Sequence, residues 1–533
     1  MNILSVSDFN LKIKGQEILK NISLNVESGQ IVGLAGESGS GKSMTALSIL
    51  NLLPSTSRKT GNIFFKDSCI SDFSDDKMCS IRGDKISLIF QEPLTALNPL
   101  QTIQAQVAEP LLIHKNQTKR EAYQLADETL HRVGLPRQLI SRDVYPHEIS
   151  GGQQQRVLIA KSFVLKPNLI IADEPTTSLD VTTQAGIIRL LEDLVESDGV
   201  SLLLITHDLA LLSQCAHKVA IMKSGKIIEE GEIEHVFRQR KFQYTRKLLA
   251  SINYSPEKKS IPSKNILLSV EKISSSYVGS ESFFAGNQTK FKVLNDVSFK
   301  LFESEILGVV GESGSGKSTL VKTILGLHKY ENGSIIFNNK KIDADKYTDL
   351  KTRSLMQVVF QDPYGSFNPR HKIRRLIAEP FHLVRGTFSK KEMNDRVDIA
   401  LREVGLLPDD AKKFIHEFSG GQRQRIAIAR ALIIKPKLII LDEAVSSLDV
   451  SIKAQILDLL AELAEKHSLS YLFVSHDLSV VQNISNRVIV MQKGTVVEEG
   501  TASEILSFPK TDYAKRLVKA IPKIPVSWLS GWI

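Results

Sequence analysis

The chain contains the same short sequence motifs twice, in the same order. The string GESGSGKS occurs at Gly36–Ser43 and again at Gly311–Ser318, and SGGQ follows it at Ser150–Gln153 and at Ser419–Gln422. An Asp-Glu pair and a later histidine recur after them at the same spacing. Repeats of this length are duplicated domains rather than the short units of a solenoid. The duplication therefore predicts two copies of one fold.

The length of the chain agrees with two domains. With 533 residues it is too long for one ordinary hydrophobic core. The join is expected within 254–264, where Pro, Ser and Lys replace apolar periodicity. We therefore predict a first domain over 1–256, a linker over 257–265 and a second domain over 266–533.

Short runs of Val, Ile and Leu precede the repeated motifs in each copy. Apolar runs without polar alternation are typical of a parallel sheet that is covered on both faces. A helical pattern over Thr45–Leu53 follows the first Gly-rich string. Each copy is therefore predicted to be an α/β domain. The predicted strands are Ile31–Ala35, Leu169–Ala172 and Leu202–Ile205 in the first copy, and Ile306–Val310, Leu438–Leu441 and Leu472–Val474 in the second.

The Gly-rich strings have the spacing of a phosphate-binding loop between a strand and a helix. Glycines permit the tight turn that points backbone N–H groups at phosphate oxygens, and the following helix adds the positive end of its dipole. Lys42 and Lys317 are expected to reach the β- and γ-phosphates, and Ser43 and Ser318 to bind Mg²⁺. The predicted nucleotide-binding residues of the two loops are Gly36, Ser38, Gly39, Gly41, Lys42 and Ser43, with Gly311, Ser313, Gly314, Gly316, Lys317 and Ser318.

Acidic residues end one apolar strand in each copy. Asp173 and Asp442 are expected to hold Mg²⁺ through its water shell. Glu174 and Glu443 follow directly and are expected to polarise the attacking water. The recurring histidines, His207 and His476, come after the next apolar strand, and we expect them to contact the γ-phosphate or that water.

These residues together resemble the ABC ATPase family over nearly the whole chain. The segments Glu148–Arg156 (EISGGQQQR) and Glu417–Arg425 (EFSGGQRQR) are similar to the family signature, although Ile149 and Phe418 replace its usual leucine. The resemblance implies a RecA-like parallel-sheet core with a helical subdomain and an antiparallel β part in each copy. It also implies ATP and Mg²⁺ as cofactors. Gln91 and Gln361 match the Q-loop glutamine near Mg²⁺ and the γ-phosphate, and Ser178–Asp180 and Ser447–Asp449 match the D-loop.

In this family two nucleotide domains face each other head to tail, so the resemblance implies two composite ATP sites. Site one would combine the first phosphate loop with the second signature, and site two the reverse. The signature residues expected to contact nucleotide are Ser150, Gly151, Gly152 and Gln153, with Ser419, Gly420, Gly421 and Gln422. Tyr277 matches the ring that stacks on adenine in the family, whereas Ile13 stands at that place in the first copy, so the two sites are expected to differ in affinity.

Three further sequence segments resemble those of the ATPase subunits of peptide, opine and nickel importers. FQEPLTALNP at Phe90–Pro99, FQDPYGSFNPR at Phe360–Arg370 and YTRKLLASI at Tyr244–Ile252 carry this likeness. The fused form is most similar to Yej-type peptide importer ATPases. The resemblance implies an ATPase that powers peptide uptake with two membrane permease subunits and a substrate-binding protein, at the cytoplasmic face of a bacterial inner membrane. Permease helices are expected on Gln91–Val107 and Gln361–Leu376.

Composition agrees with an ATPase that relies on separate permeases. No run approaches the roughly 18 apolar residues that span a bilayer. The net charge of +9 indicates scattered Lys and Arg rather than a nucleic-acid surface. Three cysteines without a CxxC pair indicate a reducing compartment and neither zinc nor an iron–sulfur cluster.

Three questions stay open from the sequence. The same ATPase could serve glutathione, nickel or a sugar, and tandem ABC domains also occur in ribosome-binding translation factors. Those factors carry a long charged helical linker, whereas the predicted linker here is short. Trp528 and Trp532 near the end of the sequence predict a tail that docks on its own domain, or else contacts a membrane or permease.

Overall fold

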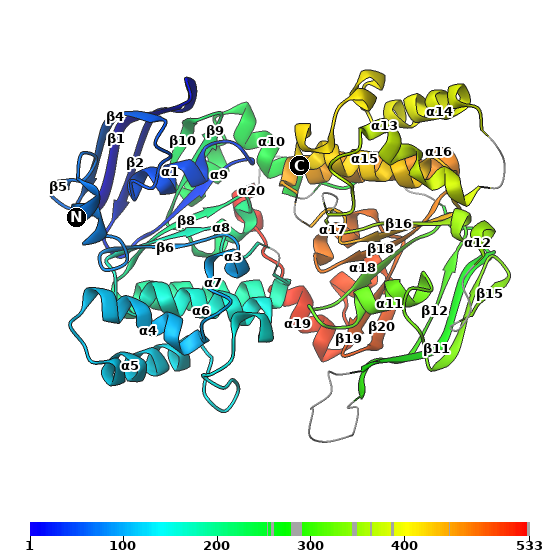
Figure 1. Cartoon of the computed structure of the whole chain (residues 1–533), viewed down its shortest axis with the longest axis horizontal. Coiled ribbons are helices and arrows are strands. Elements are labelled where there is room, and N and C mark those ends of the chain that lie inside the picture. The colour runs from blue at the N-terminus through cyan, green and yellow to red at the C-terminus, as the bar shows by residue number, and fades with distance from the viewer. Residues whose placement is uncertain are drawn as a thin grey trace.

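The computed structural model describes residues 1–177, 179–252, 254–256, 261–278, 290–343, 349–362, 365–384, 388–446 and 448–529. Two lobes of the same architecture lie side by side, the first copy at the left and the second at the right of Figure 1. Each lobe contains a six-stranded sheet, a four-stranded sheet and a group of helices. The duplication read from the sequence is therefore a duplication of the fold.

The six-stranded sheets form the centre of each lobe. Five strands of each run parallel, and one antiparallel edge strand completes the sheet. Every residue of the strand before each phosphate loop is buried. In sheet order the strands are β10 (Lys226–Glu232), β9 (Lys218–Lys223), β3 (Ile31–Ala35), β8 (Ser201–Thr206), β7 (Leu169–Asp173) and β6 (Ile86–Ile89) in the first lobe, and β20 (Thr495–Thr501), β19 (Arg487–Gln492), β13 (Ile306–Val310), β18 (Ser470–Ser475), β17 (Leu438–Asp442) and β16 (Met356–Val359) in the second.

The four-stranded sheets are antiparallel in both lobes. In β2 buried and solvent-facing side chains alternate, as expected for a sheet with one face on a core. The buried face packs with Leu203 and Ile205 of β8 in one hydrophobic cluster. In sheet order the strands are β2 (Gln16–Glu27), β1 (Asn2–Ile13), β4 (Ser57–Phe65) and β5 (Ser68–Cys69), and β12 (Lys290–Phe302), β11 (Ile266–Val278), β14 (Asn332–Phe337) and β15 (Lys340–Ile342).

Helices cover the other face of each six-stranded sheet and form a helical subdomain, which confirms the α/β prediction with its two accessory parts. The helices are α1 (Lys42–Ile49), α2 (Asp75–Cys79), α3 (Pro93–Ala96), α4 (Ile103–His114), α5 (Lys119–Arg132), α6 (Gly151–Phe163), α7 (Val181–Asp198), α8 (Leu209–Cys215), α9 (Ile233–Gln239) and α10 (Gln243–Ile252) in the first lobe. In the second they are α11 (Lys317–Ile324), α12 (Leu350–Leu355), α13 (Ile373–Ala378), α14 (Lys390–Glu403), α15 (Gly420–Leu432), α16 (Val450–His467), α17 (Leu478–Ile484), α18 (Ala502–Ser507), α19 (Asp512–Ala520) and α20 (Val526–Leu529).

The helix predicted over Thr45–Leu53 lies earlier than expected. The observed helix α1 begins at Lys42 because Gly41 supplies a left-handed N-cap, with φ of 109°. It ends at Ile49, and Asn51 has a positive φ of 52° that no helix continues through. The apolar periodicity therefore marked the helix but not its ends.

The end of each copy reaches onto the other lobe. After α10, the Tyr254 hydroxyl donates to Asp458 of α16, and Ser255 Oγ donates to the carbonyl of Asn483 at 3.3 Å. After α19, Ile524 joins the hydrophobic cluster of the first lobe, and the Trp528 ring meets Phe237 of α9 edge-on at 6.2 Å. Figure 1 shows α20 in red beside α9 of the first lobe.

The expectation that the Trp-containing tail docks on its own domain is therefore wrong for Trp528. Arg240 Nη2 of the first lobe donates to the Trp528 carbonyl at 2.7 Å, so both the ring and the backbone of the tail contact the other copy. A tail that docked on its own lobe would follow a shorter path. However, α19 packs against α7 of the first lobe and thereby places the tail beside that lobe. Trp532 lies outside the described residues.

Residues 257–260 of the predicted linker also lie outside the described part, so the domain limits 1–256, 257–265 and 266–533 stay a prediction. The second lobe's first strand, β11, begins at Ile266. Across the described ranges, no helix has the length and apolarity to cross a membrane.

Candidate functional site

Each phosphate loop connects the central strand of a six-stranded sheet to the helix behind it. The first loop lies between β3 and α1, and the second between β13 and α11. Its opening glycine has no room for a side chain, because a Cβ on Gly36 would lie 2.2 Å from the Met222 carbonyl oxygen. A Cβ on Gly311 would lie 2.3 Å from the carbonyl oxygen of Met491. The glycines are thus required by close packing of the loop against the neighbouring strand.

The loop lysines are buried and held by the loop itself. Lys42 Nζ donates to the carbonyls of Gly36 and Glu37, at 2.8 and 3.0 Å. Lys317 Nζ makes the equivalent bonds to Gly311 and Glu312, at 2.7 and 2.9 Å. Burial lowers the pKa of both lysines, and the nearby carboxylates oppose that shift. Each loop therefore carries a desolvated cation, the lysine ammonium group, which can donate to phosphate oxygens in place of the loop carbonyls.

The strand-end aspartates each present an oxygen that lacks a protein partner. Asp173 Oδ1 and Asp442 Oδ1 are buried without a hydrogen bond. Burial raises the pKa of Asp173, which a hydrogen bond with Ser43 opposes, and burial raises the pKa of Asp442 to about 6. A buried carboxylate oxygen with no donor is costly unless a cation or proton satisfies it. Asp173 beside Ser43 therefore fits the oxygen ligand set of Mg²⁺.

Such an ion would need ligands from outside the protein. Within the described ranges, no group of three His, Cys, Asp or Glu side chains comes together to hold a metal. Mg²⁺ keeps several waters and is commonly bound by one or two protein oxygens together with phosphate oxygens. The donor set present here agrees with that mode of binding.

The glutamate after each of these aspartates is the centre of a polar cluster. Glu174 Oε2 accepts from Gln91 Nε2 at 3.2 Å and from Thr177 Oγ1 at 2.9 Å, and lies 3.2 Å from His207 Nδ1. Burial acts to raise the pKa of Glu174, but the hydrogen bonds from His207 and Thr177 outweigh it and the pKa is lowered. The carboxylate is thus kept ionised, as a base requires.

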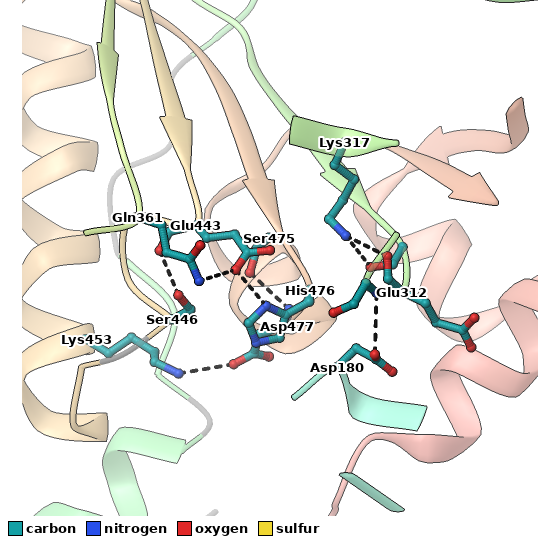
Figure 2. Close-up of polar contacts among 12 residues, drawn as sticks. Asp180, Glu312, Lys317, Gln361, Glu443, Ser446, Lys453, Ser475, His476 and Asp477 are labelled. Atoms are coloured by element: carbon teal, nitrogen blue, oxygen red, sulfur yellow. Dashed lines mark hydrogen bonds and ion pairs between the residues drawn. The ribbon is translucent and has the colours of Figure 1, made fainter. Parts of the chain in front are cut away.

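The second lobe repeats this cluster. Gln361 Nε2 donates to Glu443 Oε2 at 2.9 Å, and His476 Nδ1 lies 3.2 Å from the same oxygen. Figure 2 shows these three side chains converging from separate segments of the second lobe. Glu174 and Glu443 also share a left-handed backbone, with φ of 48° and 51°. The two matching lobes therefore turn the chain in the same way directly after the strand that carries the aspartate.

The first phosphate loop opens into a cavity of the size typical of ligand sites, and its walls come from both lobes. Its volume is 1010 Å³. Besides the loop, the first lobe contributes Gln91, Glu174 and His207, and the second contributes its signature and D-loop. The lining residues from the second lobe are Ser419, Gly420, Gly421, Leu448, Asp449 and Ile452.

The signatures begin helices whose N-termini face this interface. In α6 the Ser150 side chain accepts from Gln153 N at 3.4 Å, and Gln153 Oε1 accepts from Ser150 N at 2.9 Å, which forms a capping box. At the start of α15, Gln422 Oε1 accepts from Ser419 N at 3.0 Å and from Ser419 Oγ at 3.2 Å. A helix N-terminus of this kind attracts anions.

The second phosphate loop also meets the opposite lobe, through the D-loop. Ser313 N donates to Asp180 Oδ2 at 3.4 Å, and Thr182 Oγ1 donates to Glu312 Oε1 at 2.7 Å. Figure 2 shows Asp180 of the first lobe beside Glu312 and Lys317. Gly151 of the first signature lines the cavity at the first phosphate loop, and the place of Ser150, Gly151 and Gly152 in site two stays a prediction. Ser178 and Ser447 of the D-loops lie outside the described residues.

The tyrosine that is predicted to stack on adenine, Tyr277, has a partner that the sequence did not reveal. The Tyr277 ring stacks on His328, with centroids 4.4 Å apart, and remains 40% exposed. Ile13, its counterpart, is packed at the edge of the first lobe's hydrophobic cluster. The predicted inequality of the two sites therefore stays a prediction with a structural basis.

Two tyrosines at the phosphate loops were not predicted. Glu37 N donates to Tyr244 Oη at 3.1 Å, and Glu312 N donates to Tyr513 Oη at 3.0 Å. The two tyrosines are separated by the same spacing as the repeated SGGQ, Asp-Glu and His motifs. That shared spacing is the signal that could have identified them.

Similarity to known proteins agrees with these sites. A family model described as ABC transporter matches residues 19–177 and 294–446. The chain is 44% identical over 503 residues to the peptidoglycan transport ATP-binding protein YejF of Agrobacterium fabrum, covering 94% of this chain and 92% of that protein. An uncharacterized ABC transporter ATP-binding protein YejF of Escherichia coli K12 is 40% identical, with 97% and 99% covered. The glutathione import ATP-binding protein GsiA of Escherichia coli O157:H7 is 37% identical, with 98% and 90% covered.

Proposed function

The chain belongs to the ABC transporter family, and we propose from this premise that its ATP hydrolysis powers the uptake of peptides through separate permeases. ATP-dependent transport is common to the family and to the named relatives. The cargo rests on narrower support, because the relatives bear the names of peptidoglycan transport and glutathione import. Both of those solutes contain peptides.

The observation that carries the proposal is the cavity shared by the two lobes. Lys42, Glu174 and His207 line one wall, and Ser419 and Gly420 of the other lobe line the opposite wall. ATP bound there would contact both lobes at once, so it would favour the closed arrangement, and its hydrolysis would remove that preference. Site two is proposed to combine Lys317, Ser318, Gln361, Asp442, Glu443 and His476 with Ser150, Gly151, Gly152 and Gln153.

The proposed catalytic roles follow from the polar clusters. Glu174 and Glu443 orient and polarise the attacking water, because their carboxylates are held ionised beside the phosphate loop. His207 and Gln91 fix the Glu174 carboxylate through the hydrogen bonds described above, and His476 and Gln361 do so for Glu443. Lys42 and Lys317 supply positive charge to the transferring phosphate.

Mg²⁺ is proposed to sit between Ser43, Gln91 and Asp173 in site one, and between Ser318, Gln361 and Asp442 in site two. When bound, the ion neutralises charge on the phosphates. The unpartnered Oδ1 atoms of Asp173 and Asp442 support this assignment.

The proposed partners are two permease subunits and a substrate-binding protein, which would bring the chain to the cytoplasmic face of a bacterial inner membrane. We assign permease contacts to Gln91–Val107 and Gln361–Leu376. The two surfaces differ in charge. In the second lobe a groove of 440 Å³ is lined by Arg370, His371, Lys372, Arg374, Arg375 and Lys390 together with uncharged residues. None of the described lining residues is acidic, although Arg374 pairs with Asp398 at 2.9 Å.

The first lobe has uncharged residues at the matching places. Leu100, Gln101 and Thr102 stand where the second lobe has Arg370, His371 and Lys372 after a shared Asn-Pro. The two lobes are therefore expected to accept permease segments of different charge, the more acidic one on the second lobe.

A transport assay tests the function. The chain, co-expressed with its two proposed permease subunits, is reconstituted in vesicles, and ATP-dependent uptake of tri- to hexapeptides is compared with that of glutathione and Ni²⁺. Uptake of peptides that is lost in a Glu174→Gln, Glu443→Gln double variant supports the proposal. Preferential uptake of Ni²⁺ or glutathione would show that the assignment of peptides as the cargo is wrong. Recovery of the chain with ribosomes instead of permeases would overturn the transport function.

A further inference from the structure

We propose that Tyr244 and Tyr513 are positioning residues that tie each phosphate loop to the opposite lobe, so that closure of the lobes aligns the loop for nucleotide. This inference rests on the proposed function, because it concerns the same two ATP sites. It adds to them a residue outside the loop, the signature and the D-loop.

The first link is from tyrosine to loop. Each tyrosine oxygen accepts from the backbone N–H of the loop's second residue, Glu37 or Glu312. Burial raises the pKa of Tyr244 and of Tyr513 to about 12, so both phenols stay neutral at physiological pH. Tyr513 is only 5% exposed. If the tyrosine hydroxyl is removed, the N–H of Glu37 or Glu312 loses its hydrogen bond, and at a buried position water replaces that bond poorly.

The second link is from tyrosine to the opposite lobe. Tyr244 is in the first turn of α10, which packs against α16 of the second lobe. Tyr513 is in the first turn of α19, which packs against α7 of the first lobe. The bond from Tyr254 to Asp458 fixes the far end of the α10 segment to α16 as well.

The third link is from the D-loop of the opposite lobe back to the phosphate loop. Helices α7 and α16 begin at the D-loop aspartates, Asp180 and Asp449. Asp180 accepts from Ser313 N, next to the Glu312 amide that Tyr513 binds. Asp449 lines the cavity at the first loop together with Gly39 and Lys42.

The second loop is thus bonded from two sides by elements that meet across the interface. At the first loop the tyrosine bond is present, and Asp449 of the opposite lobe faces the same cavity. The tyrosine belongs to the loop's own lobe, and the D-loop aspartate belongs to the opposite lobe, but the helices that carry them are packed together. A change in the spacing of the lobes therefore displaces both supports of the loop. Coupling of this kind needs a contiguous physical connection, which these contacts supply.

Phenylalanine removes the hydroxyl and keeps the ring. In the full chain, Tyr513→Phe is expected to weaken one of two binding sites for the slowly hydrolysed analogue adenylyl imidodiphosphate with Mg²⁺ by about tenfold, and Tyr244→Phe the other. Tyr123→Phe on α5, in the helical subdomain, is the matched control and is expected to bind as the wild type does. A merely structural role would lower the melting temperature of the nucleotide-free chain but leave the rise on adding the analogue unchanged; we expect that rise to shrink.

A double-variant cycle identifies the connection across the interface. Thr182 Oγ1 of the first lobe contacts Glu312, the residue whose amide binds Tyr513. Thr182→Val and Tyr513→Phe are therefore expected to be non-additive in analogue affinity by a factor of about three or more, whereas Thr182→Val and Tyr244→Phe, which act on different loops, are expected to be additive.

Wild-type analogue affinity in both tyrosine variants, or equal coupling of Thr182 to both tyrosines, would overturn the proposal. The function would be unaffected by that result, because transport and hydrolysis by the wild-type chain are measured separately. Loss of transport in the wild type, in turn, would leave this binding test interpretable.

Discussion

Glu174 Oε2 and His207 Nδ1 lie 3.2 Å apart, although Glu174 follows strand β7 and His207 follows strand β8. Glu443 and His476 repeat this relationship at the same distance in the second lobe. Glu174→Gln and Glu443→Gln are each expected to slow ATP hydrolysis by about 10² to 10³-fold, because the amide cannot act as the base. Phosphate release under saturating ATP measures the rate. Retention of bound ATP after desalting should rise in the same variants, and near-normal turnover in both would rule out the assignment.

The raised pKa of Asp442 makes stability depend on pH. Burial raises this pKa from 3.8 to about 6, so the folded chain binds more protons than the unfolded chain between those values. Its contribution therefore lowers the free energy of unfolding as the pH rises through that window. Asp442→Asn should stabilise the metal-free chain at pH 7.5, by on the order of 2 kcal/mol, and change it little below pH 4.

Thermal unfolding in EDTA at both pH values checks this effect, with the exposed Asp409→Asn as control. With Mg²⁺ and nucleotide present the sign should reverse, because the ionised carboxylate is the form that binds the ion. A lower melting temperature for metal-free Asp442→Asn at pH 7.5 would contradict the role of burial.

Adenine stacking should differ between the sites. Tyr277→Ala is expected to weaken nucleotide binding at one site by on the order of 0.5 to 1.5 kcal/mol, since an aromatic contact is lost. Ile13→Ala, at the matching place of the first lobe, removes no ring and should leave nucleotide affinity nearly unchanged. Equilibrium titration with the analogue and Mg²⁺ resolves the two sites. Equal effects of the two substitutions would show that the sites do not differ in stacking.

The segment after α19, which contacts the first lobe through Ile524 and Trp528, should stabilise the packing of the two lobes. Trp528→Ala removes the edge-on contact with Phe237 and should lower the free energy of unfolding by on the order of 1 to 2 kcal/mol. Val526→Ala is the control, because Val526 is 79% exposed in the same short helix. Unfolding temperature and the rate of proteolytic cleavage after residue 521 report the effect. Identical behaviour of the two variants would mean that the tail contributes no binding energy.

The basic groove should distinguish the permeases. Arg370→Glu with Arg375→Glu is expected to reduce recovery of one of the two co-expressed permeases at least severalfold, because like charges replace a complementary pair. Lys292→Glu with Lys341→Glu, both exposed on the antiparallel sheet, serves as the charge-matched control, and the melting temperature checks folding. Recovery of both permeases at wild-type levels would exclude the groove as a permease contact.

Local sequence was sufficient for the elements whose physical requirements are local. The phosphate loops need glycines, a lysine and a strand–helix context within a few residues, and buried parallel strands need continuous apolar runs; both patterns are visible in one dimension. The same reasoning found Asp173 and Glu174 because they end such a strand. It misplaced the ends of α1, because capping at Gly41 and the turn at Asn51 decide those ends rather than periodicity.

The tertiary structure decided which distant residues share a site. No periodicity brings Asp180 to Ser313 or Trp528 to Phe237, since both pairs depend on how the two packed lobes are oriented. Nor does any periodicity bring Tyr244 to Glu37, which meet only through the tertiary folding of the first lobe. The sequence by itself determined the two sets of ATP-site residues, whose chemistry is encoded in short motifs. Only the folded interface determined how those sets are joined, because burial and hydrogen bonding between the lobes arise from contacts hundreds of residues apart along the chain.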